Sequence, residues 1–348
     1  MDQGNSANVK PAEHLEIGGH TILPGESKRI DLPTVRLYTE DITIPVYVQR
    51  GRRKGPVLLV CAAIHGDELN GIEIIGRLIK SRQLENLRGS LVAVPMVNVF
   101  GVLNQSRYLP DRRDLNRSFP GSTRGSLAGR IAHLFASEVL AKCDYGIDLH
   151  TGARNRSNLP QIRANLDDPQ TLNMARAFGV PVLLNSNLRD GSLRQCAMDK
   201  GIPMLLYEAG EALRFDELSI RAGVRGVINV MRYLNMLKTG STRKAPVEPF
   251  VARNSTWMRA PDSGLVHHRK QLGDYVEKYE VLARITDAFG NPIDQVISSI
   301  AGIIIGKQNI PLVQEGEAMY NIAHFKSPDG VVDNIELLQE HLVPELDS

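Results

Sequence analysis

Apolar runs typical of strands alternate with amphipathic, helix-like segments along the first two thirds of the chain. Residues 57–64 (VLLVCAAI) form a continuous apolar run, as a strand buried on both faces requires, and apolar residues at helical spacing follow over 72–79. The pattern favours an α/β fold with a mixed, mostly parallel sheet and helices on both faces. Further strands are predicted at 91–97, 145–149, 180–184 and 202–207, and further helices at 126–142, 169–178 and 217–237.

The segments before this alternation carry weaker signals. Residues 1–24 are polar and irregular, and we expect them to form an N-terminal arm. Residues 35–38 and 42–48 are typical of edge strands, because Pro45 has no amide hydrogen to donate within a sheet. The main domain is therefore expected to begin near residue 25.

A change of composition near residue 245 divides the rest of the chain. Residues 239–249 (TGSTRKAPVEP) are rich in Gly, Ser, Thr and Pro and are typical of a linker. Beyond them the helical spacing disappears, and short β-like stretches alternate with turns such as Asp262-Ser263-Gly264. The sequence therefore predicts a main domain at 25–245 and a small C-terminal all-β domain at 246–348.

Composition narrows the class of protein. Apolar residues make up 42% and charged residues 23% of the 348, as in a globular protein of about two domains. The formal net charge of +2 offers no broad electrostatic footprint for nucleic acid. No apolar run approaches the ~20 residues that a membrane helix needs, and the three cysteines form no CxxC pair. We expect a soluble, cytoplasmic protein with no nucleic-acid or membrane partner.

Two of the predicted strands end in histidines. The first buried strand leads directly into His65, with Glu68 three residues later, and a second strand leads into His150. A lone HxxE pair is more often a surface histidine beside a helix-capping acid. Two histidines and a glutamate at the ends of separate strands, however, give the His₂Glu set of an open catalytic zinc site. Asp148 shares a side of its strand with His150, so it is placed to orient that imidazole.

A third strand end carries a carboxylate. Glu208 follows the predicted strand 202–207, and a carboxylate that is not needed as a ligand there is placed to take a proton from water and return it to a leaving amine. Glu211 is the nearest rival for that role. Either acid alone is commonly a solvent-facing group at a strand end.

A loop rich in arginine lies between the two histidines, at 107–121 (RYLPDRRDLNRSFPG). Its Pro and Gly residues and its low apolar content argue against a core segment or a regular helix. One interpretation is a solvated surface loop with several Asp–Arg ion pairs. The other is an anion-recognition loop, because guanidinium groups bind carboxylates with two parallel hydrogen bonds. Arg112 and Arg113 have Asp111 and Asp114 beside them as ion-pair partners. The two arginines then expected to face the cleft are Arg107 and Arg117.

These motifs together resemble those of the succinylglutamate desuccinylase/aspartoacylase family, which is related to the zinc carboxypeptidases. The resemblance covers about residues 35–237 and extends more loosely through the C-terminal domain, which resembles the barrel-sandwich domain of bacterial members. The motifs that carry it are His65-Gly66-Asp67-Glu68, Asp114-Leu115-Asn116-Arg117, Asp148-Leu149-His150-Thr151-Gly152 and the later Glu208.

The resemblance implies a role for each matching residue. It implies that His65, Glu68 and His150 bind one zinc ion per chain, and that Glu208 acts as general base and acid. It implies that Arg107 polarises the scissile carbonyl. The residues implied to hold a substrate carboxylate are Asn116 and Arg117.

The leading hypothesis is a zinc-dependent deacylase that hydrolyses the amide of an N-acyl amino acid or a related small molecule. Two alternatives stay open, namely a metallocarboxypeptidase acting on short or acidic peptides and a non-catalytic anion-binding protein. The complete ligand set together with Glu208 disfavours the binding protein, because a sensor has no need of a proton shuttle. Residues 153–163 do not resemble the substrate loop of either name-giving enzyme, so the acyl group is not identified. Homo-oligomerisation is left open.

Overall fold

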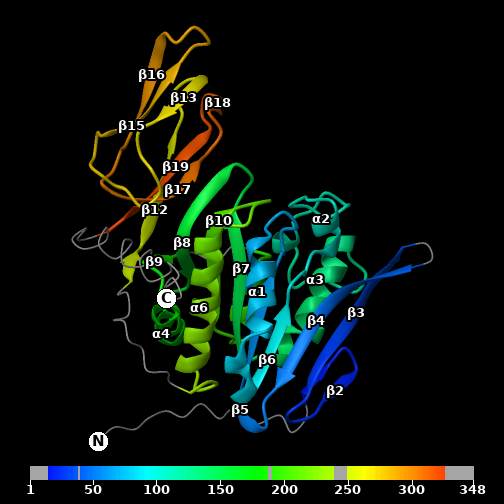
Figure 1. Ribbon diagram of the computed structural model, residues 1–348. Helices are drawn as coiled ribbons and strands as arrows, with labels where there is room; N and C mark the ends of the chain where they lie inside the picture. Colours follow the sequence, from blue (N-terminus) through cyan, green and yellow to red (C-terminus); the bar gives the residue numbers. More distant parts are fainter. Residues whose placement is uncertain (1–14, 38–39, 187–189, 239–248, 326–348) are drawn as a thin grey trace, which may run out of the picture.

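The computed structural model describes residues 15–37, 40–186, 190–238 and 249–325 (Figure 1). Four parallel strands form the centre of its large sheet, in the order β10-β7-β5-β6. The predicted strands at these positions are confirmed, with ends that differ by a few residues. Their bounds are β5 Arg53–Ala62, β6 Arg88–Val94, β7 Tyr145–Gly152 and β10 Met204–Glu211.

Alternate residues of the central strands face two different cores. In β5, Val60 packs into one core and Cys61 into the other. Since both faces of such a strand are buried, every position must be apolar, which explains the continuous apolar run in the sequence. The first core contains residues of α1 Asn70–Ile79, α4 Pro169–Phe178 and α6 Glu217–Tyr233. The second contains residues of α3 Leu127–Glu138 and α5 Leu193–Asp199.

The remaining helical segments are short. The predicted helix at 126–142 is divided into α3 and the 3-10 turn η3. Across the described parts of the chain, we find no helix with the length and apolar character needed to span a membrane. The short segments are α2 Val99–Leu103, η1 Arg82–Asn86, η2 Leu115–Arg117 and η3 Leu140–Lys142.

The large sheet is mixed, and its excess of parallel pairs is confined to the main domain. Within residues 25–245, four of the described strand pairs are parallel and three are antiparallel. When the described C-terminal strands are included, antiparallel neighbours outnumber parallel ones. One cause is β8 Arg156–Ala164, which runs antiparallel to β10. Residues 153–155 are the whole connection from β7 to β8, and this is too short for the crossover that a parallel strand requires.

The N-terminal side of the sheet also runs antiparallel. β4 Glu40–Arg50 pairs with β3 Ser27–Leu37 along its length and with β6 through Tyr47–Arg50 alone. At Pro45, β4 therefore pairs with β3 on one side and lies beyond its pairing with β6 on the other. A residue without an amide hydrogen is tolerated at such an unpaired edge.

Residues 15–22 depart from the irregular arm expected at the N-terminus. They form a hairpin of β1 Leu15–Ile17 and β2 His20–Ile22. Leu15, Ile17 and Ile22 are buried in the core that contains α3, so three apolar side chains anchor the segment. The expectation was wrong for these residues, while residues 1–14 lie outside the described ones.

Strands from the C-terminal part of the chain extend the large sheet. β17 Gly302–Gln308 pairs with β8, and β11 Phe250–Ala252 pairs with β9 Val182–Asn185. The described residues from 249 onward contain no helix, as the sequence predicted, while residues 239–248 of the expected linker lie outside the described part. The other strands joined to this sheet are β12 Asn254–Arg259, β14 Tyr275–Val276 and β19 Ala318–His324.

A second, four-stranded sheet covers the end of the molecule that lies farthest from the helices in Figure 1. Its strand order is β16-β15-β13-β18. Its apolar residues share a small core with residues of β12, β17 and β19. The bounds are β13 Gly264–His268, β15 Val281–Thr286, β16 Pro292–Ile297 and β18 Leu312–Val313.

Candidate active site

The turn that follows β5 carries His65 and Glu68. Gly66 lies against the backbone of α2, where a Cβ atom would come 1.9 Å from the carbonyl carbon of Gly101. Glycine is therefore required beside the histidine. The Glu68 amide donates to the His65 carbonyl oxygen at 3.1 Å, which closes the turn just before α1 and directs both side chains to the carboxyl end of the sheet.

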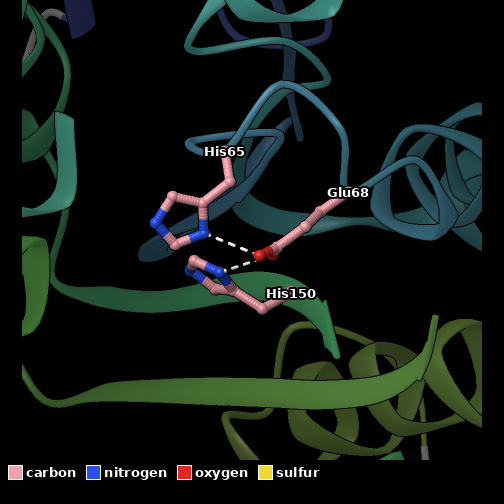
Figure 2. A group of neighbouring side chains, drawn as sticks. All are labelled: His65, Glu68 and His150. Atoms are coloured by element: carbon pink, nitrogen blue, oxygen red, sulfur yellow. Dashed lines mark hydrogen bonds and ion pairs between the residues drawn. The ribbon is translucent and has the colours of Figure 1, made fainter. Parts of the chain in front are cut away.

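His65, Glu68 and His150 converge at that end (Figure 2). Glu68 Oε1 lies 2.7 Å from His65 Nδ1, and Glu68 Oε2 lies 2.7 Å from His150 Nδ1. All three residues are buried, and one donor atom from each lies within 4.8 Å of the others. The structure thus brings together, from β7 and the turn after β5, the three residues expected as metal ligands.

A second carboxylate faces the far nitrogen of each imidazole. Asp148 Oδ2 lies 2.7 Å from His150 Nε2, because both residues project from the same side of β7. Asp114 Oδ1 lies 3.2 Å from His65 Nε2. The sequence analysis predicted that Asp148 contacts His150 but did not predict that Asp114 contacts His65. The reason is that Asp114 lies 49 residues from His65 along the chain.

The donor set fits a divalent metal ion. Since an ionised carboxylate can only accept, Asp114 and Asp148 favour the tautomers with a hydrogen on Nε2. The Nδ1 lone pairs then face the acceptor oxygens of Glu68 at 2.7 Å, which requires a positive charge between them. A proton or a metal ion supplies that charge. Imidazole nitrogens, a carboxylate and outer carboxylates that orient the rings are typical of zinc sites.

Charge within the cluster shifts the pKa values of its members. Burial alone would raise the pKa of Glu68, but the nearby His65 and His150 hold it well below its usual range. Burial would lower the pKa of His150, yet Asp148 and then Glu68 raise it well above the usual value. Glu68 therefore stays ionised, as a metal ligand must.

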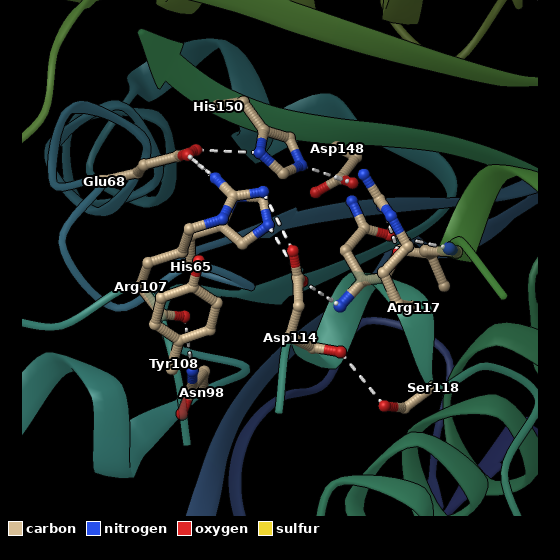
Figure 3. Close-up of polar contacts among 12 residues, drawn as sticks. His65, Glu68, Asn98, Arg107, Tyr108, Asp114, Arg117, Ser118, Asp148 and His150 are labelled. Carbon is tan, nitrogen blue, oxygen red and sulfur yellow. Dashed lines mark hydrogen bonds and ion pairs between the residues drawn. The ribbon is translucent and has the colours of Figure 1, made fainter. Parts of the chain in front are cut away.

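Arg107 lies beside the cluster and pairs with Asp114 (Figure 3). Its Nη2 is 3.0 Å from Asp114 Oδ2, and its Nη1 is 3.2 Å from His65 Nδ1 and 3.5 Å from Glu68 Oε1. Burial opposes the charged form of Arg107, but Glu68 and Asp114 raise its pKa. Arg107 therefore stays cationic at the edge of the cluster.

The expected pairing of Asp114 with its neighbour Arg113 was wrong. Arg113 Nε lies 4.0 Å from Asp111, which also accepts from the backbone amides of Arg113 and Ala128. Asp114 thereby remains available for Arg107 and His65. Adjacent side chains in a turn diverge, so the nearest residue in the sequence was not the nearest in space.

Asn116 and Arg117 follow in η2 and also line the cavity at the cluster. Asn116 Oδ1 accepts from the Leu193 amide at 2.9 Å, so the amide nitrogen is the group that it can offer to a ligand. Arg117 Nη1 donates to the Asn116 carbonyl oxygen at 2.5 Å. Both side chains thus present donors, as recognition of an anion requires.

Of the two candidate bases, Glu208 is the one in the cavity wall. It lies opposite His150 in the parallel pairing of β10 with β7, so the two side chains share a face of the sheet. Its Oε2 lies 2.5 Å from Arg163 Nε. Glu211 instead accepts from the Asn155 amide at 3.0 Å and from Asn309 Nδ2 at 2.8 Å, so it joins β10 to the C-terminal strands.

The cavity itself has a volume of about 230 Å³. Besides the residues named above, four large side chains that sequence reasoning missed line it. Trp257 comes from β12, and Arg156 lies with its Cζ atom 5.4 Å from the centre of the indole ring. The four are Arg156, Arg163, Arg194 and Trp257.

The fold and the cluster define an α/β protein with a candidate mononuclear metal centre at the carboxyl end of its parallel strands. The model of the succinylglutamate desuccinylase/aspartoacylase catalytic domain matches residues 54–234, and the chain belongs to this family. The resemblance inferred from the motifs is thereby confirmed.

Individual relatives agree with this assignment. The chain is 30% identical over 258 residues to N-alpha-acetyl-L-2,4-diaminobutyric acid deacetylase of Halomonas elongata, covering 71% of this chain and 75% of that protein. A succinylglutamate desuccinylase/aspartoacylase structure from Rhodobacter sphaeroides matches with a TM-score of 0.76 at 25% identity, covering 87% of this chain and 96% of that one. The product-bound ectoine utilization protein EutE (DoeB) from Ruegeria pomeroyi shares the fold, with a TM-score of 0.77 at 24% identity over 86% and 97% of the chains.

Proposed function

We propose that the protein is a zinc-dependent deacylase that hydrolyses the amide bond of a small N-acyl amino acid. The observation that carries this proposal is the position of Glu208 and Arg107 in the wall of the same cavity as the His65–Glu68–His150 cluster. The Halomonas relative, named as a deacetylase of an N-acetyl amino acid, supports this reaction class.

His65, Glu68 and His150 would hold the ion. A divalent ion bound there supplies Lewis acidity, which makes water more acidic and draws electron density from a carbonyl oxygen. Asp148 and Asp114 hold the two imidazoles through their Nε2 atoms, at 2.7 and 3.2 Å. These hydrogen bonds keep both Nδ1 atoms directed at the centre of the cluster.

Glu208 moves the proton. As a carboxylate on the face of the sheet that carries His150, it takes a proton from the attacking water and returns it to the leaving amine nitrogen. Arg163 Nε forms an ion pair with the Oε2 atom of Glu208. Since Glu211 is bound to Asn155 and Asn309, Glu208 is the carboxylate we assign to this role.

The arginines stabilise negative charge. Arg107 is held by Asp114 next to His65, where its guanidinium donates to the carbonyl oxygen as that oxygen becomes negative. Asn116 and Arg117 bind the free carboxylate of the amino acid. The three free, buried cysteines suit the reducing cytoplasm, in which we place this enzyme.

A hydrolysis screen tests the proposal. Zinc-loaded protein is incubated with N-acetyl, N-succinyl and N-formyl amino acids, with N-acetyl-L-2,4-diaminobutyrate and with short peptides, and the released amine is quantified. We expect turnover of N-acyl amino acids. Turnover confined to peptides would identify a carboxypeptidase instead, and no turnover alongside tight anion binding would identify a binding protein.

A further inference from the structure

One side chain in the apolar run of β5 can donate a hydrogen bond. Residues 57–64 read VLLVCAAI, and Cys61 is the one residue among them with a donor in its side chain. The side chain is buried in the core that contains α3. The proposed reaction makes no use of this thiol, so its contacts decide whether it has a role beyond packing.

The thiol contacts Asp148. Cys61 lies directly opposite Asp148 in the parallel pairing of β5 with β7, so both side chains project from the same face of the sheet. Cys61 Sγ donates to Asp148 Oδ1 at 3.6 Å. Burial and then Asp148 raise the pKa of Cys61 well above its usual value, so the thiol keeps its proton and remains the donor.

Each oxygen of Asp148 has a different partner. Oδ2 lies 2.7 Å from His150 Nε2 (Figure 3), and Oδ1 accepts from Cys61. The carboxylate is 0% exposed, so bulk water does not reach it. Among the described residues, no other donor contacts Oδ1. The three residues therefore form a hydrogen-bonded chain that runs from β5 across β7 to the metal-ligand cluster.

This chain fixes the direction of the His150 ring. The carboxylate at Nε2 sets the tautomer and the orientation of an imidazole that binds a metal through Nδ1. The last torsion of an aspartate side chain has broad preferences, so a carboxylate held by one oxygen can rotate. A donor on the second oxygen restricts that rotation and keeps Oδ2 directed at His150.

A cysteine suits this position better than a larger or more polar residue. The strand is buried on both faces, so the side chain at this position must pack as an apolar group. A thiol does so, because it behaves as a small hydrophobe. It is also a weak donor, so it restrains the carboxylate and leaves the stronger hydrogen bond to His150.

We propose that Cys61 is a positioning residue for the metal centre, which acts through Asp148 on His150. This rests on the proposed function, because it takes His150 as a ligand of the ion. It adds a residue that touches neither the ion nor the substrate, since Cys61 is not among the residues that line the cavity.

Zinc affinity, measured by competition with a chelator, tests the proposal without turnover. Cys61→Ala should lower the affinity by about 10-fold, the smaller end of the loss expected when an outer partner of a metal-binding imidazole is removed. Cys61→Ser differs from Cys61→Ala by one hydroxyl group that can donate, so it should recover part of the affinity. KM at saturating zinc should keep its wild-type value in both variants.

Cys143→Ala is the matched control. Cys143 is a buried cysteine of the same core, but its thiol donates to the Val139 carbonyl oxygen at 3.3 Å. Both alanine variants should lower Tm, because each leaves a cavity. Cys143→Ala should nevertheless keep the wild-type zinc affinity.

A double-mutant cycle tests the path through Asp148. In an Asp148→Ala background, adding Cys61→Ala should lower zinc affinity no further, because the thiol then has no carboxylate to restrain. A further loss of about 10-fold in that background would show that the two residues act independently, and it would overturn the proposal.

Other results would overturn the proposal as well. These are wild-type zinc affinity in Cys61→Ala, an equal loss of affinity in Cys143→Ala, and equal affinities in Cys61→Ala and Cys61→Ser. Failure of the proposed function is a separate result. Wild-type protein that binds zinc and hydrolyses no N-acyl amino acid would end the deacylase assignment, and the zinc affinities would still decide the role of Cys61.

Discussion

Asp114 connects three parts of the candidate site, so Asp114→Asn is an informative substitution. One of its oxygens accepts from His65 Nε2 at 3.2 Å and from the Asn116 amide at 2.8 Å. The other accepts from Arg107 at 3.0 Å. Asparagine keeps the shape, but it removes the negative charge and turns an amide N–H₂ group toward either His65 or Arg107, both of which are donors.

Two effects of different size follow. Loss of the carboxylate that orients a ligand imidazole typically lowers metal affinity by about 10- to 100-fold. Loss of the charged hydrogen bond to Arg107 costs about 1.5–3 kcal/mol, which corresponds to about 10- to 100-fold in kcat/KM where Arg107 stabilises the reacting carbonyl oxygen. At saturating zinc the first effect disappears and the second remains.

The assay measures zinc affinity by competition with a chelator, and kcat/KM at saturating zinc. Asp111→Asn is the control, because Asp111 lies on the same loop but binds Arg113 and the Ala128 amide. It should leave both quantities unchanged. Wild-type zinc affinity and wild-type kcat/KM in Asp114→Asn would refute the role that we derive for the Asp114 contacts.

Three further predictions concern other residues. Glu208→Gln should lower kcat by about 10²-fold or more with zinc content unchanged, as expected on removal of a general base; Glu211→Gln should instead lower Tm. Wild-type enzyme should cleave an N-acyl amino acid about 10²-fold faster in kcat/KM than its methyl ester, and Arg117→Ala should lose most of that preference. In the folded protein, burial and to a smaller extent Lys307 lower the pKa of His268 from 6.5 to about 4. Between these two pH values, the unfolded chain binds a proton at this histidine and the folded chain does not. Stability should therefore fall as the pH drops from 6.5 to 4, and His268→Gln should flatten this slope.

Each of these has a result that contradicts it. Near-normal turnover of Glu208→Gln would transfer the role of the base to Glu211. Equal cleavage of acid and ester by wild type would leave a general amidase or esterase. For the pH dependence, Tm is measured from pH 4 to 7 with His267→Gln as the control, because His267 is the exposed neighbour. An equal flattening in both variants would contradict the assignment to His268.

Sequence patterns predicted the elements that local chemistry determines. The helix α4 was predicted at its observed bounds, since Asp168 caps it, Pro169 suits its first turn and Gly179 ends it in the left-handed region. The positions of His65, Glu68 and His150 at strand ends followed from the apolar runs before them. These signals lie within a few residues of the feature that they specify.

Features that depend on the pairing of strands far apart in the sequence were not predictable in this way. β8 contains Arg156, Pro160 and Arg163 and has the composition of a loop, but pairing with β10 on one side and β17 on the other stabilises it as a strand. Pro160 lies where the register of β8 with β10 shifts, so its missing amide hydrogen breaks no regular ladder. Trp257 reaches the cavity from β12, which pairs with the distant strand β19, and no local pattern encodes that pairing.

The zinc content of purified protein tests the central claim most directly. The account predicts about one zinc ion per chain in wild type, as an open site with three protein ligands implies, and almost none in His150→Ala. Hydrolysis should be lost with the metal and recovered in wild type alone when zinc is returned. Full zinc occupancy in His150→Ala would contradict the assignment of His65, Glu68 and His150 as the metal ligands.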